Sequence, residues 1–240
     1  MLALEGIVKA YGPNRVLDGF SLHAGAEEIV CVLGPSGCGK TTLLNIAGGL
    51  IAPDAGLVRR PPGHPGYVFQ EARLLPWRTA ADNLALGLRA QGVPKKARDA
   101  IVASYLDQLG LAGAAHLYPH QLSGGMRQRV ALGRAFAVQP AYLLLDEPFK
   151  SLDIGLRLTL VRLLLDEWLR RPRPVLFVTH DTAEAALAAH RILVLDGQPA
   201  TIRAELTIET PPHQRQPDDA EVLQTEAQLY ALLANTSPTP

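Results

Sequence analysis

The sequence is poor in cysteine and in aromatic residues, and it carries no net charge. Its two cysteines, Cys31 and Cys38, are too few for a disulfide framework, so we expect two unpaired thiols in a reducing compartment. The 23 basic residues are balanced by 23 acidic ones. A chain without a general positive field has no broad means of capturing nucleic acid, and we expect no nucleic-acid partner.

Long apolar runs are also missing. No stretch approaches the roughly 18 consecutive apolar residues of a membrane-spanning helix, and the first residues, MLALEGIVKAYG, lack the pattern of a secretion signal. We therefore expect a cytoplasmic protein whose link to a membrane comes through a partner. Because 48% of the residues are apolar and 19% are charged, the chain can bury a core, and bulk disorder is excluded.

Short apolar runs alternate with amphipathic stretches along most of the chain. Runs that are apolar at successive positions are typical of parallel strands covered on both faces, so the alternation predicts an α/β fold with a parallel sheet. The expected strands cover residues 29–33, 142–145, 175–179 and 192–195, and the expected helices cover residues 40–47, 155–170 and 183–189.

Two regions break this alternation. The first thirty residues, with a turn signal at residues 11–14, predict short strands in an antiparallel subdomain. Residues 71–134 read as a helical insertion. Its apolar stripe is expected at four-residue spacing, on Ala97, Ile101, Tyr105 and Leu109.

The tail forms a further region. After Thr201 we expect one more strand, a turn at Pro211-Pro212, a helix over residues 220–233 and a loose SPTP end. The predicted organisation is therefore a main domain over residues 1–200, with residues 71–134 inserted, and a short extension over residues 201–240.

One motif carries a clear chemical meaning. Residues 34–41, GPSGCGKT, match the phosphate-binding loop of P-loop proteins, between an apolar strand and a helix as that loop requires. Its glycines let the backbone N–H groups surround phosphates, and the helix N-terminus adds a favourable dipole. We expect Lys40 to neutralise the β- and γ-phosphates and Thr41 to ligate magnesium.

A second motif lies at the end of an expected strand. Residues 142–145 lead into Asp146 and Glu147, at the sheet edge where open α/β folds bind ligands. We expect Asp146 to hold magnesium, directly or through water, and Glu147 to polarise the attacking water. Taken alone, such an acidic pair is equally typical of a helix cap or an ion pair.

A third motif precedes a helix. In Leu122-Ser123-Gly124-Gly125, Ser123 is a good N-cap and the glycines leave N–H groups open for an anion. The alternative is a capped helix with a basic face.

Together, LSGGMRQR, GPSGCGKT and LLLDEP resemble the ATP-binding subunit of an ABC transporter, over about residues 4–196. The resemblance implies a P-loop NTPase core of the RecA-like type with an N-terminal antiparallel β subdomain and a helical insertion. It also implies ATP and Mg2+ as ligands. The nucleotide-binding residues that it implies are Tyr11, Gly34, Pro35, Ser36, Gly37, Cys38, Gly39, Lys40, Thr41, Thr42, Ser123, Gly124, Gly125 and Asp153.

The same resemblance assigns further roles. Tyr11 is similar to the aromatic residue that stacks on adenine, although packing is the alternative, and Gln70 to the glutamine that senses magnesium and the attacking water. Ser151-Leu152-Asp153 resembles the loop that contacts the opposite subunit, with a helix cap as the alternative. His180 resembles the histidine that contacts the γ-phosphate, with a structural histidine as the alternative. Catalysis is thus expected from Glu147, His180 and Gln70, and metal binding from Thr41, Gln70 and Asp146.

Partners follow from the resemblance as well. Such subunits form head-to-tail homodimers, with ATP between the phosphate loop of one copy and the Ser-Gly-Gly of the other. Residues 71–88 are similar to ATPases of importers for nitrate, sulfonates and taurine. In these, transmembrane permease subunits dock beside this segment and a periplasmic or lipid-anchored binding protein delivers the solute. Trp77 would then line the docking groove or, alternatively, pack inside the insertion.

We therefore expect an importer ATPase at the cytoplasmic face of the inner membrane. The alternatives are a soluble ABC ATPase, an exporter subunit or a module that closes on ATP without hydrolysing it. One departure from the family pattern is Lys150-Ser151, where Gly-Ala is commoner.

Overall fold

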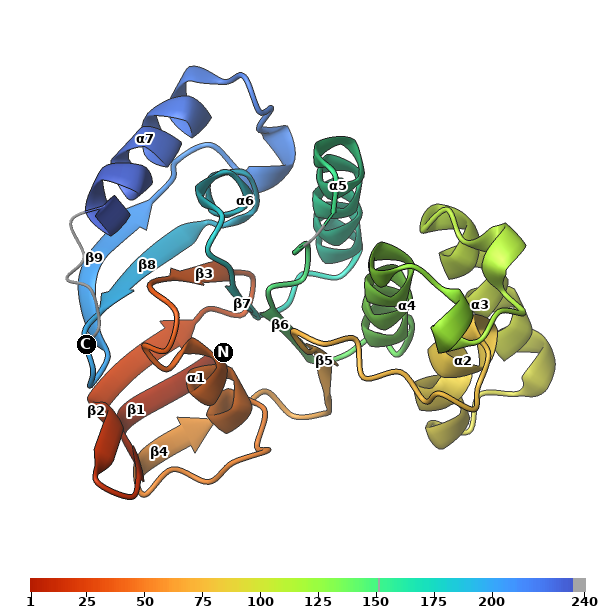
Figure 1. The fold of residues 1–240 in the computed structure, drawn as a ribbon, viewed down its shortest axis with the longest axis horizontal. Helices are drawn as coiled ribbons and strands as arrows, with labels where there is room; N and C mark the ends of the chain where they lie inside the picture. The colour runs from red at the N-terminus through yellow and green to blue at the C-terminus, as the bar shows by residue number, and fades with distance from the viewer. Residues whose placement is uncertain (151, 235–240) are drawn as a thin grey trace.

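The computed structural model describes residues 1–150 and 152–234. Ser151, part of the expected dimer loop, and the SPTP end of the chain lie outside the described residues. Within them, the strands form two sheets, and three helices form a lobe at one end of the larger sheet, beside strand β5, Pro65–Val68 (Figure 1).

The larger sheet contains six strands in the described part of the chain, in the order β5-β6-β7-β3-β8-β9. All neighbours are parallel except β8 and β9, which are antiparallel. The predicted parallel sheet is therefore confirmed, and its strands are β3 (Ile29–Leu33), β5 (Pro65–Val68), β6 (Tyr142–Asp146), β7 (Val175–Val178), β8 (Arg191–Asp196) and β9 (Thr201–Thr207).

Both faces of the sheet are covered over its central strands, which explains why every residue of β3, β6 and β7 is buried. Along β3, Ile29, Cys31 and Leu33 join one core cluster, whereas Val30 and Val32 join another on the opposite face. The first cluster packs under α5 (Ile154–Arg170) and α6 (Thr182–Ala188). The second packs under α1 (Lys40–Ala47) and the smaller sheet.

The smaller sheet is antiparallel, in the order β2-β1-β4, and confirms the expected β subdomain. Its strands are β1 (Leu2–Tyr11), β2 (Asn14–Ala24) and β4 (Ala55–Arg59). One expectation was wrong here, and one strand was not predicted. The first two strands are long rather than short, because they continue through irregularities in their register. The third strand was not expected, since its five residues are mostly exposed and carry little apolar pattern.

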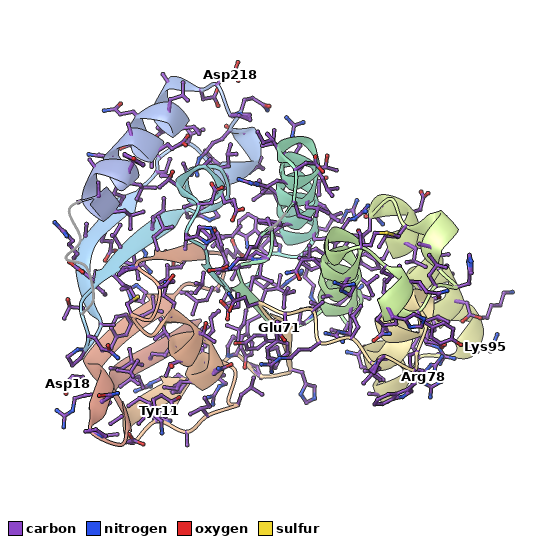
Figure 2. All side chains as sticks on the ribbon, in the orientation of Figure 1. Tyr11, Asp18, Glu71, Arg78, Lys95 and Asp218 are labelled. Carbon is purple, nitrogen blue, oxygen red and sulfur yellow. The ribbon has the colours of Figure 1, made fainter. Side chains whose placement is uncertain are left out.

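The helical lobe consists mainly of α2 (Ala80–Ala90), α3 (Lys95–Gln108) and α4 (Gly124–Ala137), with the short helices η1 (Ala112–Ala114) and η2 (Pro119–Gln121). In Figure 2, Arg78 and Lys95 lie at its outer end, and Glu71 lies where the chain leaves the core. The expected stripe on α3 is wrong at Ala97, which is exposed. The buried face runs instead through Val102, Tyr105, Leu106 and Leu109.

The tail adds β9 to the sheet edge and places α7 (Ala220–Ala234) against α6. The short helix η3 (Pro212–Gln214), which precedes α7 in the chain, contacts α5 and α6. Arg215 fixes this segment, because its Nη1 donates to the carbonyls of Ala186 and Ala189 at 2.7 Å each. Among the described residues, none of the helices combines the length and the apolar character of a membrane span.

Candidate functional site

A cleft of about 410 Å³ opens where β3 and β6 end and α1 begins. This is the edge at which open α/β sheets bind ligands. Tyr11, labelled in Figure 2 at the end of β1, reaches its mouth and is 47% exposed. The cleft is lined by Tyr11, Val16, Ser36, Gly37, Gly39, Lys40, Thr41, Thr42, Gln70, Asp146, Glu147 and Val178.

The loop between β3 and α1 depends on glycine at two positions. Gly37 and Gly39 have φ of 84° and 102°, which side chains rarely tolerate. A Cβ on Gly39 would also lie 2.6 Å from Cγ1 of Val16. The loop therefore turns tightly into the N-terminus of α1, where its free N–H groups and the helix dipole favour an anion.

Lys40 stabilises this loop through hydrogen bonds to its backbone. Its ammonium group donates to the carbonyls of Gly34 at 2.8 Å and Pro35 at 2.6 Å, and its side chain is largely buried. Because an ammonium group has three donors, it can also reach an anion in the cleft.

Two oxygen atoms that could ligate a metal ion meet on the floor of the cleft. Oγ1 of Thr41, at the start of α1, donates to Oδ2 of Asp146, at the end of β6, at 2.9 Å. Burial raises the pKa of the Asp146 carboxyl, and the neighbouring Glu147 adds to this, whereas Thr41 and Lys40 oppose it. A hydroxyl and a carboxylate beside a phosphate loop are the hard oxygen ligands that Mg2+ prefers, so these residues fit that ion.

Glu147 follows in a strained position, with a φ of 47°. Its Oε2 accepts from Lys150 Nζ at 2.7 Å and from Gln70 Nε2 at 3.5 Å, and its Oε1 lies 3.3 Å from Nδ1 of His180. Burial pushes its pKa upward, but Lys150 and His180 outweigh burial and hold the pKa below the ordinary range. Glu147 is therefore an ionised carboxylate at neutral pH.

The loop that carries His180 is anchored by a partly buried network of side chains. His180 follows β7, and the next residue, Asp181, caps α6 by accepting from the N–H groups of Ala183 and Glu184. Arg157 of α5 pairs with Asp181, and its Nε lies 3.6 Å from Oε1 of Glu184. This network joins the start of α5 to the loop that carries His180.

The Ser-Gly-Gly motif lies outside the cleft of its own subunit. Ser123 caps α4 by accepting from the N–H of Met126 at 3.2 Å, and Gly124 lines a separate groove. Asp153 caps α5 by accepting from the N–H of Leu156 at 2.9 Å. A Cβ on Gly125 would lie 3.0 Å from Cδ2 of Leu152, so the two caps belong to neighbouring surfaces.

The cleft thus gathers most of the expected residues but not all of them. Gly34 and Pro35 contribute carbonyls to Lys40, and Cys38 is buried beneath the loop. Both expected thiols, Cys31 and Cys38, are free and buried. Trp77 is 68% exposed, so the alternative of packing inside the helical lobe was wrong.

Three residues at the site were not expected. Val16, from β2, and Val178, at the end of β7, line the cleft but belong to no motif, and only the folded structure shows their positions. Lys150 contacts Glu147 directly. Its spacing of three residues from an acidic residue is visible in the sequence as a charge pattern.

A phosphate loop on a parallel sheet, with a Thr-Asp oxygen pair and an ionised glutamate at the strand ends, defines a P-loop nucleotide-binding protein. The family model described as ABC transporter matches residues 17–150. The chain belongs to the ABC transporter family, as its motifs predicted, and it is an ATP-binding ATPase of that family.

Among curated relatives, the taurine import ATP-binding protein TauB of Yersinia pestis is 41% identical, with 87% of this chain and 84% of the relative covered. The aliphatic sulfonates import ATP-binding protein SsuB 2 of Pseudomonas savastanoi is 43% identical, over 96% and 82%. The nitrate import ATP-binding protein NrtD of Synechocystis is 40% identical, over 86% and 80%. The predicted importer subfamily agrees with these names.

Among solved structures, the dimeric ATP-binding cassette MJ0796, in a post-hydrolysis state bound to ADP and Pi, superimposes with a TM-score of 0.82. It is 30% identical and covers 88% of this chain and 100% of its own. The predicted ABC ATPase fold is therefore confirmed.

Proposed function

We propose that this chain is the ATP-hydrolysing subunit of an importer for a small oxyanionic solute such as taurine, nitrate or an aliphatic sulfonate. The observation that carries the proposal is the contact of Glu147 with both Gln70 and His180, at the edge of the phosphate-loop cleft. The names of the relatives support the solute class. In this proposal the ATPase unit spans residues 1–200, residues 71–134 form its helical arm and residues 201–240 extend it.

The side chains divide the chemistry among them. Lys40 and the loop N–H groups bind the phosphates, and Tyr11 covers the base at the mouth of the cleft. Thr41, Asp146 and Gln70 would hold Mg2+, which supplies positive charge beside the phosphates when bound. Glu147 orients a water molecule and accepts its proton, and His180 contacts the γ-phosphate.

Further residues act across an interface between two copies. Ser123, Gly124, Gly125 and Asp153 lie outside their own cleft, which supports a head-to-tail homodimer in which they complete the partner's site. Two permease subunits would dock on the helical lobe, where the exposed Trp77 offers an apolar contact. A binding protein acts with the permeases, and the chain stays peripheral at the cytoplasmic face of the membrane.

Two experiments test the proposal. In a phosphate-release assay with saturating Mg-ATP, Glu147→Gln should lower kcat by about 100-fold or more while ATP binding persists. Glu5→Gln, at an exposed position on β1, is the matched control and should match the wild type. Equal rates for Glu147→Gln and wild type would refute Glu147 as the base.

The second experiment identifies partners. The tagged chain is purified from gently solubilised native membranes, and the accompanying proteins are identified by mass spectrometry. A multi-spanning partner supports the importer. Recovery of soluble or ribosomal partners alone would refute the transport role and leave the ATPase site intact.

A further inference from the structure

The shortest contact of the Glu147 carboxylate is with a residue outside the expected site. Lys150 Nζ lies 2.7 Å from Oε2, compared with 3.5 Å for Gln70 and 3.3 Å between Oε1 and His180. One of the two carboxylate oxygens is thus held by a close ion pair. The contacts of Gln70 and His180 with the Glu147 carboxylate are both longer than this ion pair.

The backbone fixes this pair in place. The N–H of Lys150 donates to the carbonyl of Glu147 at 3.2 Å, which closes a turn over Pro148 and Phe149. Phe149 is fully buried, and Nε2 of Gln128 donates to the Pro148 carbonyl at 3.2 Å. The turn therefore brings the side chains of Glu147 and Lys150 to the same side of the backbone, where they form the ion pair.

Lys150 does not belong to the nucleotide cleft. It lines a neighbouring groove that it shares with Gln70, Gly124 and Arg127, whereas the cleft wall includes Glu147 itself. Its side chain is 44% exposed, compared with 14% for that of Glu147. The ammonium group can therefore leave the carboxylate without disturbing the residues that hold the phosphates.

From these contacts, and resting on the proposed role of Glu147, we propose that Lys150 is a positioning residue that restrains hydrolysis in the resting subunit. Its ammonium group occupies Oε2, the carboxylate oxygen that also faces Gln70. A water molecule that gives its proton to this oxygen competes with the ammonium group, whose positive charge also lowers the basicity of the carboxylate. We call this ion pair between Lys150 and Glu147 the latch. Breaking it requires movement of the Lys150 side chain alone.

If the latch restrains hydrolysis, removing the ion pair should raise the rate of ATP hydrolysis rather than lower it. A half-exposed ion pair is weak, so Lys150→Ala should raise the kcat of ATP hydrolysis by about two- to fivefold. The KM for ATP should stay within about twofold of the wild-type value, since Lys150 lies outside the cleft. Lys150→Arg keeps a cation in place and should restore the low rate.

The decisive measurement is a double-mutant cycle on the purified full chain. Steady-state phosphate release is measured for wild type, Lys150→Ala, Glu147→Gln and the double variant. The gain from Lys150→Ala should vanish in the Glu147→Gln background, because the latch acts only through that carboxylate. Lys95→Ala, which removes the exposed ion pair with Asp99 on α3, is the control and should match wild type.

The outcomes separate the two proposals. If Glu147→Gln is as active as wild type, both the base and the latch are refuted. If Glu147→Gln is inactive but Lys150→Ala is equal to or slower than wild type, the base stands and the latch is refuted. Thermal unfolding of each variant, with unchanged midpoints, verifies that folding is intact.

Discussion

Oγ1 of Thr41 donates to Oδ2 of Asp146 at 2.9 Å, across 105 positions of the sequence. The bond joins the N-terminus of α1 to the end of β6, and it places two oxygen ligands beside the phosphate loop. Neither side chain alone would define a cation site. Their contact is what makes the floor of the cleft suited to Mg2+.

The first prediction concerns this pair. Asp146→Asn removes the negative charge and should lower Mg-dependent ATP hydrolysis by about 100-fold, because the cation loses a charged ligand. Asp166→Asn, at an exposed position on α5, is the control. Hydrolysis is titrated with MgCl2 for each variant. An unchanged magnesium dependence for Asp146→Asn would exclude this residue as a ligand.

The second prediction concerns the phosphate loop. Gly39→Ala forces a side chain into a left-handed conformation and against Val16, which should cost at least about 1 kcal/mol of unfolding free energy and weaken ATP binding. Gly113→Ala, in open space with no left-handed φ, should change neither. Urea unfolding and fluorescent nucleotide titration measure the two effects. Equal behaviour of the two variants would contradict the strain argument.

The third prediction is a pH dependence of stability. Burial raises the pKa of Glu184 from 4.5 to about 7, with Asp181 adding to it and Thr179 and Arg157 opposing it. The folded state therefore binds this proton more tightly than the unfolded state. Its contribution to stability is complete below pH 4.5 and is lost as the pH rises to about 7.

Glu184→Gln has no such proton to lose. Its unfolding free energy relative to wild type should rise by up to roughly 1.4 kcal/mol per pH unit over that window and then level off. Urea unfolding between pH 5 and pH 8 measures the difference, with the exposed Glu5→Gln as control. Parallel profiles for the two variants would contradict the assignment.

The fourth prediction tests the shared sites of the proposed dimer. Lys40→Ala damages the phosphate loop, and Ser123→Arg blocks the Ser-Gly-Gly surface, so each variant alone should be inactive. In a head-to-tail dimer of the two variants, one site has both defects and the other has none. Mixing them should therefore restore hydrolysis.

A control variant separates the effect of the added arginine side chain from the loss of the α4 cap. Ser123→Ala removes the cap of α4, which costs about 1 kcal/mol of stability, without adding bulk, and it should retain more hydrolysis than Ser123→Arg. If the mixed variants stay inactive although they form dimers, each site is complete within one subunit, and the head-to-tail proposal fails.

The local sequence pattern was sufficient to predict those features whose residues are neighbours in the chain. The bounds of β3 and α1 match the prediction because an apolar strand, a glycine loop and a helix follow one another directly. The capping role of Ser123 followed from its position before a helix, and the observed bond agrees. Ala97 shows the limit, since its regular spacing on α3 did not determine which face of that helix packs.

The sequence by itself determined the family, the phosphate loop and the alternation of strands and helices, because these depend on neighbouring residues and on local backbone preferences. Tertiary structure alone decided that β4 completes the small sheet, that Val16 reaches the cleft and that Trp77 is exposed. It also decided which residues surround Glu147. Gln70 and His180 reach this carboxylate from 77 and 33 positions away, and such contacts arise only when parallel strands end at the same edge of one sheet.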